Sequence, residues 1–347
     1  GHRLVAARKG AIRLDHGDVF LAEEEHAASV ASTMRVAAID QGTNTTRLLV
    51  ADVDDGRVDD VVARQEITRL GEGVDSRRRL LPLPIARVRN VLTDYRREAE
   101  RLGAERVLLT ATSAVRDAEN GEAFLGEIEW SYGFTTQLLG GEDEAELTFR
   151  GVTSDRQLER PTLVLDIGGG STEFVVAGPA GVLSRYSIDM GSVRLTERFL
   201  RSDPPSPSEL GACAGHVAAS IPEDLVVDDA IGVAGTITSL AAIELGMEEY
   251  DRDRIHGHRL TLEAIEREVE RLSLMPLTVR ERVTGLHPDR APVIVAGGII
   301  VRETLSRLGL DALTVSERDI LHGIALEAAQ LPEPVEGDAP PGAYTCC

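Results

Sequence analysis

Two short stretches of the chain combine the residue types that bind phosphate groups. Each follows an apolar run that ends in aspartate, turns through glycine and hydroxyl residues, and leads into a second apolar run. Small turn residues let backbone N–H groups approach an anion, and the aspartate can hold a hydrated divalent cation. The pattern predicts two strand-turn-strand hairpins that enclose one phosphate site. The two stretches are Asp40-Gln41-Gly42-Thr43-Asn44-Thr45-Thr46-Arg47 and Asp166-Ile167-Gly168-Gly169-Gly170-Ser171-Thr172-Glu173.

The turns predict the groups that contact phosphate, and the strand ends predict the metal ligands. Asp166 and Glu173 are expected to share one divalent cation, and Asp40 to contribute from the opposite wall. Arg47 either neutralises a transferring phosphoryl group or is a surface residue of its strand. The phosphate-binding residues predicted from the two turns are Gly42, Thr43, Asn44, Thr45, Gly168, Gly169, Gly170, Ser171 and Thr172.

Two more small-residue turns precede predicted helices and add candidate anion sites. They contain the pairs Gly191-Ser192 and Gly235-Thr236. A helix N-terminus with glycine and a hydroxyl group can bind an anion, or the hydroxyl can simply cap the helix. The sequence contains no P-loop, no nucleophile elbow and no Cys/His pair suited to nucleophilic catalysis, so we expect phosphate chemistry without a covalent intermediate.

The composition excludes several classes of partner. The 347 residues include 37 basic and 58 acidic ones, which gives a net charge of -21. Such a field repels nucleic acids and membrane surfaces, so neither is expected as a partner. A phosphate site must therefore have local positive charge, from arginine and from a metal ion. The basic residues are almost all arginine, which suits forked phosphate contacts, and Lys9 is the one lysine.

The cysteine content and the hydropathy predict a soluble cytoplasmic protein. The three cysteines, Cys213, Cys346 and Cys347, are too few for a disulfide scaffold and lack metal-ligand spacing. No apolar run approaches the length of a membrane span, and no secretory signal is visible.

The periodicity predicts the same order of elements in two halves. In the first half we expect strands near 35–40, 46–53, 57–69, 106–110 and 135–139, with helices at 82–102, 118–130 and 141–152. In the second half we expect strands near 162–166, 172–178, 182–189, 230–233, 292–296 and 312–315. The helices predicted there begin at 191 and 206, end at 245, span 261–273, run from Gly297-Gly298 to 308, and span 317–329.

This order indicates two α/β domains, each with a mixed five-stranded sheet flanked by helices, and a cleft between them. The first domain is expected at 34–141, completed by a C-terminal helix at 317–331, and the second at 142–316. Residues 1–33 are interpreted as an N-terminal extension and 332–347 as a disordered tail.

Over residues 34–330 the ordered motifs resemble the exopolyphosphatase / guanosine pentaphosphate phosphohydrolase family, a branch of the actin-like, sugar-kinase and heat-shock-chaperone ATPase superfamily. Besides the two hairpins, the matching stretches are Ala111-Thr112-Ser113-Ala114-Val115-Arg116-Asp117-Ala118, Gly141-Glu142-Asp143-Glu144-Ala145, Met190-Gly191-Ser192-Val193-Arg194, Gly235-Thr236-Ile237-Thr238, His256-Gly257 and Asp289-Arg290-Ala291.

The resemblance implies an actin-like (ribonuclease H-like) fold and a set of roles. Glu144, which by itself could be a helix-dipole residue, aligns with the proposed general base, and Arg47 aligns with a catalytic arginine. Arg116 and Arg290 match arginines expected to contact phosphate. The implied cofactor is Mg²⁺ or Mn²⁺, the implied substrate is inorganic polyphosphate, and a homodimer is expected.

Alternatives stay open at this point. The same site could hydrolyse guanosine pentaphosphate (pppGpp), or the protein could bind pppGpp or ppGpp as a regulator. A filament or a sugar kinase would need ATP chemistry that we do not predict. Longer family members carry extra C-terminal domains, so short polyphosphate chains are expected here. Arg77-Arg78-Arg79 either guides the chain or forms a solvated loop.

Overall fold

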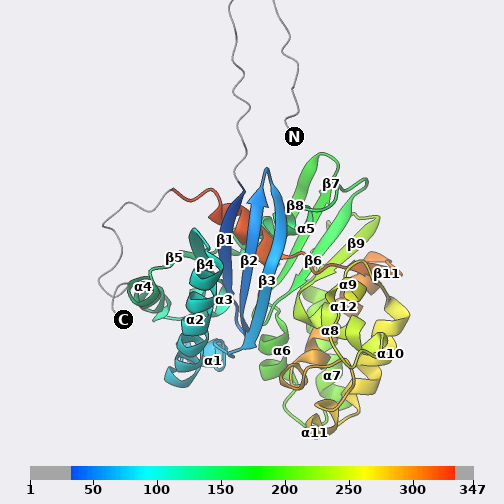
Figure 1. Ribbon diagram of the computed structural model, residues 1–347. Coiled ribbons are helices and arrows are strands. Elements are labelled where there is room, and N and C mark those ends of the chain that lie inside the picture. The colour runs from blue at the N-terminus through cyan, green and yellow to red at the C-terminus, as the bar shows by residue number, and fades with distance from the viewer. Residues whose placement is uncertain (1–32, 333–347) are drawn as a thin grey trace, which may run out of the picture. The chain divides into compact units, whose positions relative to one another are not determined.

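A computed structural model describes residues 33–332, which build two mixed β-sheets flanked by helices (Figure 1). The extension predicted at 1–33 and the tail predicted at 332–347, with Lys9, Cys346 and Cys347, lie outside this range except for Thr33 and Pro332. None of the helices between residues 33 and 332 is long and apolar enough to cross a bilayer.

The first sheet has five strands in the order β3-β2-β1-β4-β5. β1 to β3 form an antiparallel meander, and β4 and β5 join it in parallel. The expected elements of this half are confirmed, and two one-turn helices are added. Their bounds are β1 Met34–Gln41, β2 Thr45–Asp54, β3 Arg57–Ile67, α1 Val74–Arg77, α2 Pro82–Leu102, β4 Arg106–Ala111, α3 Ser113–Arg116, α4 Gly121–Tyr132 and β5 Thr135–Leu138.

The second sheet has six strands in the order β10-β11-β9-β6-β7-β8, rather than the five predicted. The sixth is the short edge strand β10. The bounds are α5 Gly141–Val152, β6 Thr162–Ile167, β7 Thr172–Gly178, β8 Gly181–Ile188, α6 Ser192–Phe199, α7 Pro207–Ser220, β9 Asp229–Val233, α8 Ala234–Glu244, α9 Arg252–Ile255, β10 Arg259–Thr261, α10 Leu262–Ser273, α11 Leu277–Arg280, η1 Pro288–Arg290, α12 Ile294–Leu308, β11 Ala312–Val315 and α13 Ile320–Ala328.

Both central strands are buried on both faces, which explains their continuous apolar runs. On β1, Ala37 and Ile39 pack with α2, whereas Val36 and Ala38 pack with α13 on the opposite face. β6 is likewise buried along its whole length. The period-two alternation of side chains therefore buries all of β6 and β1 from Val36 to Gln41, instead of leaving one face of each strand in water.

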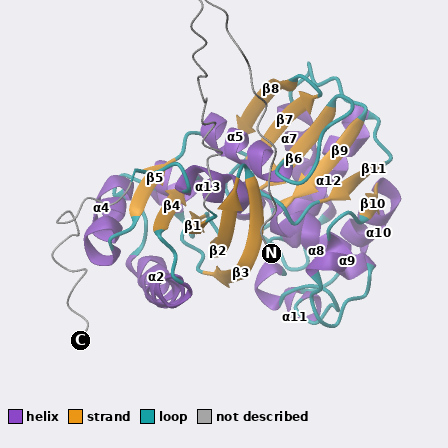
Figure 2. Ribbon diagram, turned by 45° about the horizontal axis from the view of Figure 1, so that its top comes forward, coloured by secondary structure: helices purple, strands orange, loops and turns teal. Residues whose placement is uncertain are grey.

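Helices α5 and α13 pack against each other and each covers one sheet (Figure 2). Their contact passes through two glycines. A Cβ atom on Gly151 would lie 1.8 Å from the carbonyl oxygen of Asp319, and one on Gly323 would lie 2.0 Å from that of Leu147. The backbones can approach this closely only because both side chains are absent. α13 packs on β1, β2 and β4, far from it in sequence, but the division into domains stays a prediction.

The strand predicted at 292–296 is wrong, because this segment opens helix α12. The β-branched run is buried among helices rather than in a sheet, and periodicity alone cannot separate the two cases. Gly297 and Gly298 lie inside the helix, where added Cβ atoms would approach Thr236 and Val269 to 2.5 Å. These glycines permit close helix packing and do not form a turn. The last helix begins at Ile320, three residues later than predicted.

Gly151→Ala should destabilise the protein by about 1–3 kcal/mol, because the new methyl group forces α5 and α13 apart. Urea unfolding measures this change in the free energy of unfolding. The control is Gly215→Ala in α7, where an added Cβ meets nothing within 4 Å. That change should raise the free energy of unfolding by about 0.4–1 kcal/mol. Equal effects of the two substitutions would contradict the close contact.

Candidate active site

The two predicted hairpins have the same turn geometry. In each, the turn glycine donates its N–H to the carbonyl oxygen three residues later, Gly42 to Thr45 and Gly168 to Ser171, both at 3.0 Å. The strand register places Asp40 opposite Arg47 in the first hairpin and Asp166 opposite Glu173 in the second. The two hairpins are therefore equivalent in shape but differ in charge at one position.

In the first hairpin the turn carbonyls are bonded by neighbouring backbone. The Thr43 oxygen accepts from the N–H of Gly71, and the Asn44 oxygen accepts from those of Thr68 and Arg69. The N–H groups of Thr43 and Asn44 donate no hydrogen bond within residues 33–332. An amide N–H without a partner at a cavity wall is a donor available to an anion.

The second hairpin has the same arrangement, with α6 as the neighbour. The N–H groups of residues 191–194 donate to the carbonyl oxygens of Gly168, Gly169 and Gly170. In the described part of the chain, the amides of Gly169, Gly170 and Ser171 donate to no partner. The α6 N-terminus, predicted as an anion site at Gly191-Ser192, thus bonds the loop rather than a ligand, although Ser192 still reaches the cavity.

The tips of the two hairpins touch. A Cβ atom on Gly169 would lie 2.9 Å from that of Thr43, and one on Gly170 would lie 2.3 Å from Ser113 Oγ. Ser113 and Thr43 share a hydrogen bond of 2.9 Å between their hydroxyl groups. The glycines were predicted to let backbone approach an anion. At 169 and 170, the absence of a side chain also allows the close contact between the two hairpins.

One cavity collects most of the predicted residues. Sequence reasoning assigned no role to Gln65, Thr112 or Ser113 in its wall, although Thr112 and Ser113 belong to a stretch that matches the family. Five predicted residues lie outside the lining: Arg116, Gly170, Thr172, Glu173 and Gly191. The predicted residues that line it are Asp40, Gly42, Thr43, Asn44, Thr45, Arg47, Glu144, Asp166, Gly168, Gly169, Ser171, Ser192, Gly235, Thr236 and Arg290.

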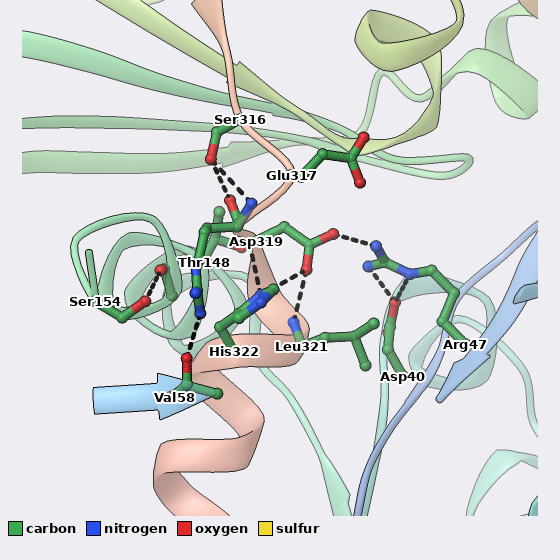
Figure 3. Close-up of polar contacts among 12 residues, drawn as sticks. Asp40, Arg47, Val58, Thr148, Ser154, Ser316, Glu317, Asp319, Leu321 and His322 are labelled. Carbon is green, nitrogen blue, oxygen red and sulfur yellow. Dashed lines mark hydrogen bonds and ion pairs between the residues drawn. The ribbon is translucent and has the colours of Figure 1, made fainter. Parts of the chain in front are cut away.

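Arg47 lies between two carboxylates (Figure 3). It donates to Asp40 Oδ2 from Nε at 3.0 Å and from Nη2 at 2.6 Å, and its Nη1 donates to Asp319 Oδ2. Asp319 is held in turn by the N–H of Leu321, because it caps α13. Asp40 was predicted as a metal ligand, but Arg47 occupies one of its oxygens. Asp319 was not predicted, since it lies 272 positions from Arg47 and no local signal links them.

Glu144 projects from the first turn of α5 into the cavity wall. It is buried, and its Oε2 has no hydrogen-bond partner among the described residues. Arg116 approaches this oxygen to 3.7 Å while donating to the carbonyl oxygen of Leu139. Burial, then the charges of Glu173, Asp166 and Asp40, hold the pKa of Glu144 well above its usual value, and Arg116 opposes the shift.

Asp166 and Glu173 form a buried pair of like charges. Burial raises the pKa of Asp166 to about 7, and burial with the charge of Asp166 raises the pKa of Glu173 to about 8. Asp166 accepts from Thr148 Oγ1 and Glu173 from Ser187 Oγ, but Glu173 Oε2 is buried without a hydrogen-bond partner. Opposed carboxylates with a free oxygen suit a hard divalent cation.

Residues 33–332 contain no group of three His, Cys, Asp or Glu side chains placed to hold a metal ion. Mg²⁺ does not require such a cage, because it keeps several waters and binds through one or two carboxylates together with substrate phosphates. The donor set at Asp166 and Glu173 therefore fits the predicted cofactor.

Arg290, the last residue of η1, also lines this cavity. It packs directly on Gly235, where a Cβ atom would lie 1.4 Å from its Nη1. It donates to Gln65 Oε1 at 2.8 Å and forms no ion pair with a carboxylate in the described chain. Burial, with the charge of Arg47, lowers the pKa of Arg290 to about 10. Arg290 is partly exposed, and the charge of Glu317 opposes this lowering of its pKa without forming an ion pair, so the guanidinium can still attract an anionic ligand.

The start of α8 lies beside Arg290. Ala234 has φ +65°, a conformation that L-residues rarely adopt, and Gly235 and Thr236 follow it in the cavity wall. Non-glycine residues in such a conformation cluster at functional sites. The Arg77-Arg78-Arg79 cluster is exposed and does not line this cavity.

Residues 49–331 match the Ppx/GppA phosphatase family. The chain belongs to this family. It is 41% identical to exopolyphosphatase 2 of Mycobacterium tuberculosis (strain ATCC 25618 / H37Rv) over 315 residues, which cover 85% of this chain and 98% of the relative. The Aquifex aeolicus Ppx/GppA enzyme superposes with a TM-score of 0.74 at 33% identity, covering 85% of this chain and all of that one.

A second solved relative, an exopolyphosphatase from Cytophaga hutchinsonii, has a TM-score of 0.77 at 26% identity and covers 84% of this chain and 96% of that one. These likenesses confirm the expected family and fold class.

In metal-free Ppx/GppA protein, stability should fall as pH rises. The folded pKa values of Asp166 and Glu173 lie above their unfolded values, so the folded state holds these protons more tightly. The resulting stabilisation is present at low pH and is lost between the unfolded values near 4 and the folded values. Glu173→Gln stays neutral and should flatten this decline, by on the order of a few kcal/mol at alkaline pH.

Urea unfolding in EDTA at about pH 5 and about pH 9 tests this prediction. Glu249→Gln, at an exposed position, is the matched control and should leave the slope unchanged. A wild-type slope in Glu173→Gln would contradict the buried like-charge pair.

Proposed function

We propose that this protein is an exopolyphosphatase that hydrolyses the terminal phosphoanhydride of inorganic polyphosphate and releases orthophosphate. Beyond membership of the family, one structural observation supports this proposal. Glu144 Oε2 is buried without a hydrogen-bond partner in the wall of the cavity where the free amides of both hairpins meet. A carboxylate with a free oxygen beside an anion cradle is suited to hold and deprotonate an attacking water.

The hairpin amides bind the terminal phosphoryl group. The N–H groups of Thr43, Asn44, Gly169 and Ser171 donate to its equatorial oxygens, where charge gathers during transfer. Arg290 adds a positive charge whose direct hydrogen-bond partner is the neutral side chain of Gln65. These groups replace the water that a phosphate loses on entering the cavity.

The reaction is a direct displacement by water. Glu144 takes a proton from the water while the water oxygen forms a bond to phosphorus and the bridging P–O bond breaks. The shortened polyphosphate leaves with the electron pair of that bond. Glu144 must be ionised to act as a base, so its raised pKa has to fall when the site is loaded.

A divalent cation bound beside Glu144 would lower its pKa in this way. Asp166 and Glu173 would hold Mg²⁺ or Mn²⁺, which when bound neutralises phosphate oxygens and the surrounding carboxylates. Arg47 is held between Asp40 and Asp319 and faces the cavity, so it can stabilise charge on the transferring group without leaving its position.

Glu144→Gln should lower the rate of phosphate release from polyphosphate by about 10²–10⁴-fold, because the general base is lost while its shape remains. Steady-state phosphate release with Mg²⁺ measures kcat. Glu142→Gln, an exposed residue in the same helical turn, is the control and should keep wild-type turnover. A fully active Glu144→Gln variant would remove Glu144 from the mechanism.

A second substrate is supported by an adjoining cavity of ≈ 580 Å³. It shares Arg47, Gln65 and Arg290 with the phosphate cavity and is more apolar, with Met247, Leu286 and Leu321 in its lining. The lining also contains charged residues, among them Arg64, Arg252 and Glu317, so it offers both apolar and hydrogen-bonding contacts to a nucleoside. The observation favours pppGpp 5'-phosphohydrolysis at the same site.

Phosphate release from polyphosphates of several lengths and from pppGpp, compared as kcat/KM, separates the two substrates. We expect turnover of polyphosphate, with short chains preferred. A value for pppGpp far above every polyphosphate would make the nucleotide the principal substrate, and binding without turnover would indicate an alarmone-binding regulator. Location in the cytoplasm and assembly as a homodimer stay predictions.

A further inference from the structure

Arg194 is a buried arginine that the reaction described above does not use. It lies in α6, is 7% exposed, and forms charge-assisted hydrogen bonds in three directions. Its Nε donates to the carbonyl oxygen of Gly170 at 2.8 Å, its Nη1 to Asp75 Oδ1 at 2.5 Å, and its Nη2 to Asp117 Oδ2 at 2.5 Å. A planar guanidinium can satisfy such a set, whereas a lysine ammonium lacks the reach and the fork.

The bond from Arg194 Nε reaches the turn of the second hairpin, residues 168–171, which we call the second phosphate loop; the turn at 42–45 is the first. Backbone N–H groups of α6 already bond the three loop carbonyls, and Arg194 Nε adds a second bond to that of Gly170. With their carbonyls held in this way, the peptide groups of the loop are oriented, and the amides of Gly169 and Ser171 are left for the ligand.

The other two directions lead to the first sheet. Asp75 lies in α1, and Asp117 directly follows α3. α3 begins at Ser113, whose hydroxyl bonds Thr43 of the first phosphate loop, and ends at Arg116, which approaches Glu144. A single side chain is thus bonded to one loop and to the support of the other.

We propose that Arg194 is a positioning residue that sets the spacing and orientation of the two phosphate loops, and so of the groups that contact the transferring phosphoryl. This inference rests on the proposed function, but its structural part can be tested without any turnover. It follows from position rather than from charge alone, because each acceptor of Arg194 belongs to a different segment of the fold.

The chain offers a matched control four residues along the same helix. Arg198 also donates to Asp75, from Nε at 2.7 Å and Nη2 at 2.6 Å, but it is exposed and, within the described residues, forms no hydrogen bond with residues 168–171. Arg198→Met therefore removes an Asp75 ion pair of the same kind without releasing Gly170. A difference between the two variants isolates the contacts that Arg194 alone makes.

The first experiment compares Arg194→Met and Arg198→Met by steady-state phosphate release from tripolyphosphate with Mg²⁺. Misplacement of one loop by a fraction of an ångström to an ångström should lower kcat/KM by up to about 10²-fold in Arg194→Met. KM should rise along with the loss of kcat, because the loop binds substrate as well as the transition state. Arg198→Met should stay within about twofold of wild type. Equal kinetics in the two variants would overturn the proposal.

The second experiment needs no activity. Hydrogen exchange of the amides at residues 191–193, which donate to the carbonyl oxygens of residues 168–170, followed by mass spectrometry, should be faster in Arg194→Met than in wild type and unchanged in Arg198→Met. Asp117→Asn should speed exchange in the wild-type background and add little in Arg194→Met, since the two changes cut the same link. Unchanged exchange of these amides in Arg194→Met would also overturn the proposal.

Two further outcomes are informative. If Arg194→Met does not fold, Arg194→Lys replaces it, and wild-type amide exchange and kinetics in that variant would contradict the need for three fixed bonds. If the wild-type protein hydrolyses no polyphosphate while Arg194→Met still loosens the loop, the positioning role stands and the proposed function fails.

Discussion

The structure depends on the contact between the tips of two hairpins that turn their amides toward one space. Thr43 of one tip lies against Gly169 and Gly170 of the other, at a distance that a Cβ atom on either glycine would prevent. On both sides the turn carbonyls are bonded to neighbouring backbone, so the N–H groups that remain point away from these bonds. The result is a set of fixed dipoles that needs no reorganisation when an anion enters.

Arg47 and Glu173 occupy equivalent positions in the two hairpins and carry opposite charges, so the two hairpins can contribute different groups to the site. Arg47 opposite Asp40 produces a compensated pair that Asp319 completes. Glu173 opposite Asp166 produces a pair of carboxylates, and their pKa values rise as a result of burial. One hairpin thus presents a fixed arginine, and the other a site whose charge is best balanced by a bound cation.

The surrounding helices place the remaining groups. α5 carries Glu144 and α13 is capped by Asp319, and the two helices meet through Gly151 and Gly323. The proposed base and the residue that holds Arg47 are therefore positioned by one helix crossing, which connects elements far apart in the chain. Arg194 provides a second such link behind the loops. Both links use contacts between residues that no local pattern could pair.

The sequence by itself determined the hairpins, the order of most elements, the family and most of the residues that line the cavity, because strand alternation, turn composition and motif spacing are local properties. Prediction from the sequence failed where the structure is decided by contacts between residues far apart in the chain. The buried run at 292–296 has the same apolar character in a helix as in a strand, and only its packing against α8 and α10 decides between them. The tertiary structure alone decided that the α6 N-terminus holds a loop instead of a phosphate, that Asp40 pairs with Arg47, and that Asp319 and Gln65 join the site. Each of these depends on which donor and acceptor the complete fold brings together, and no local sequence pattern specifies that pairing.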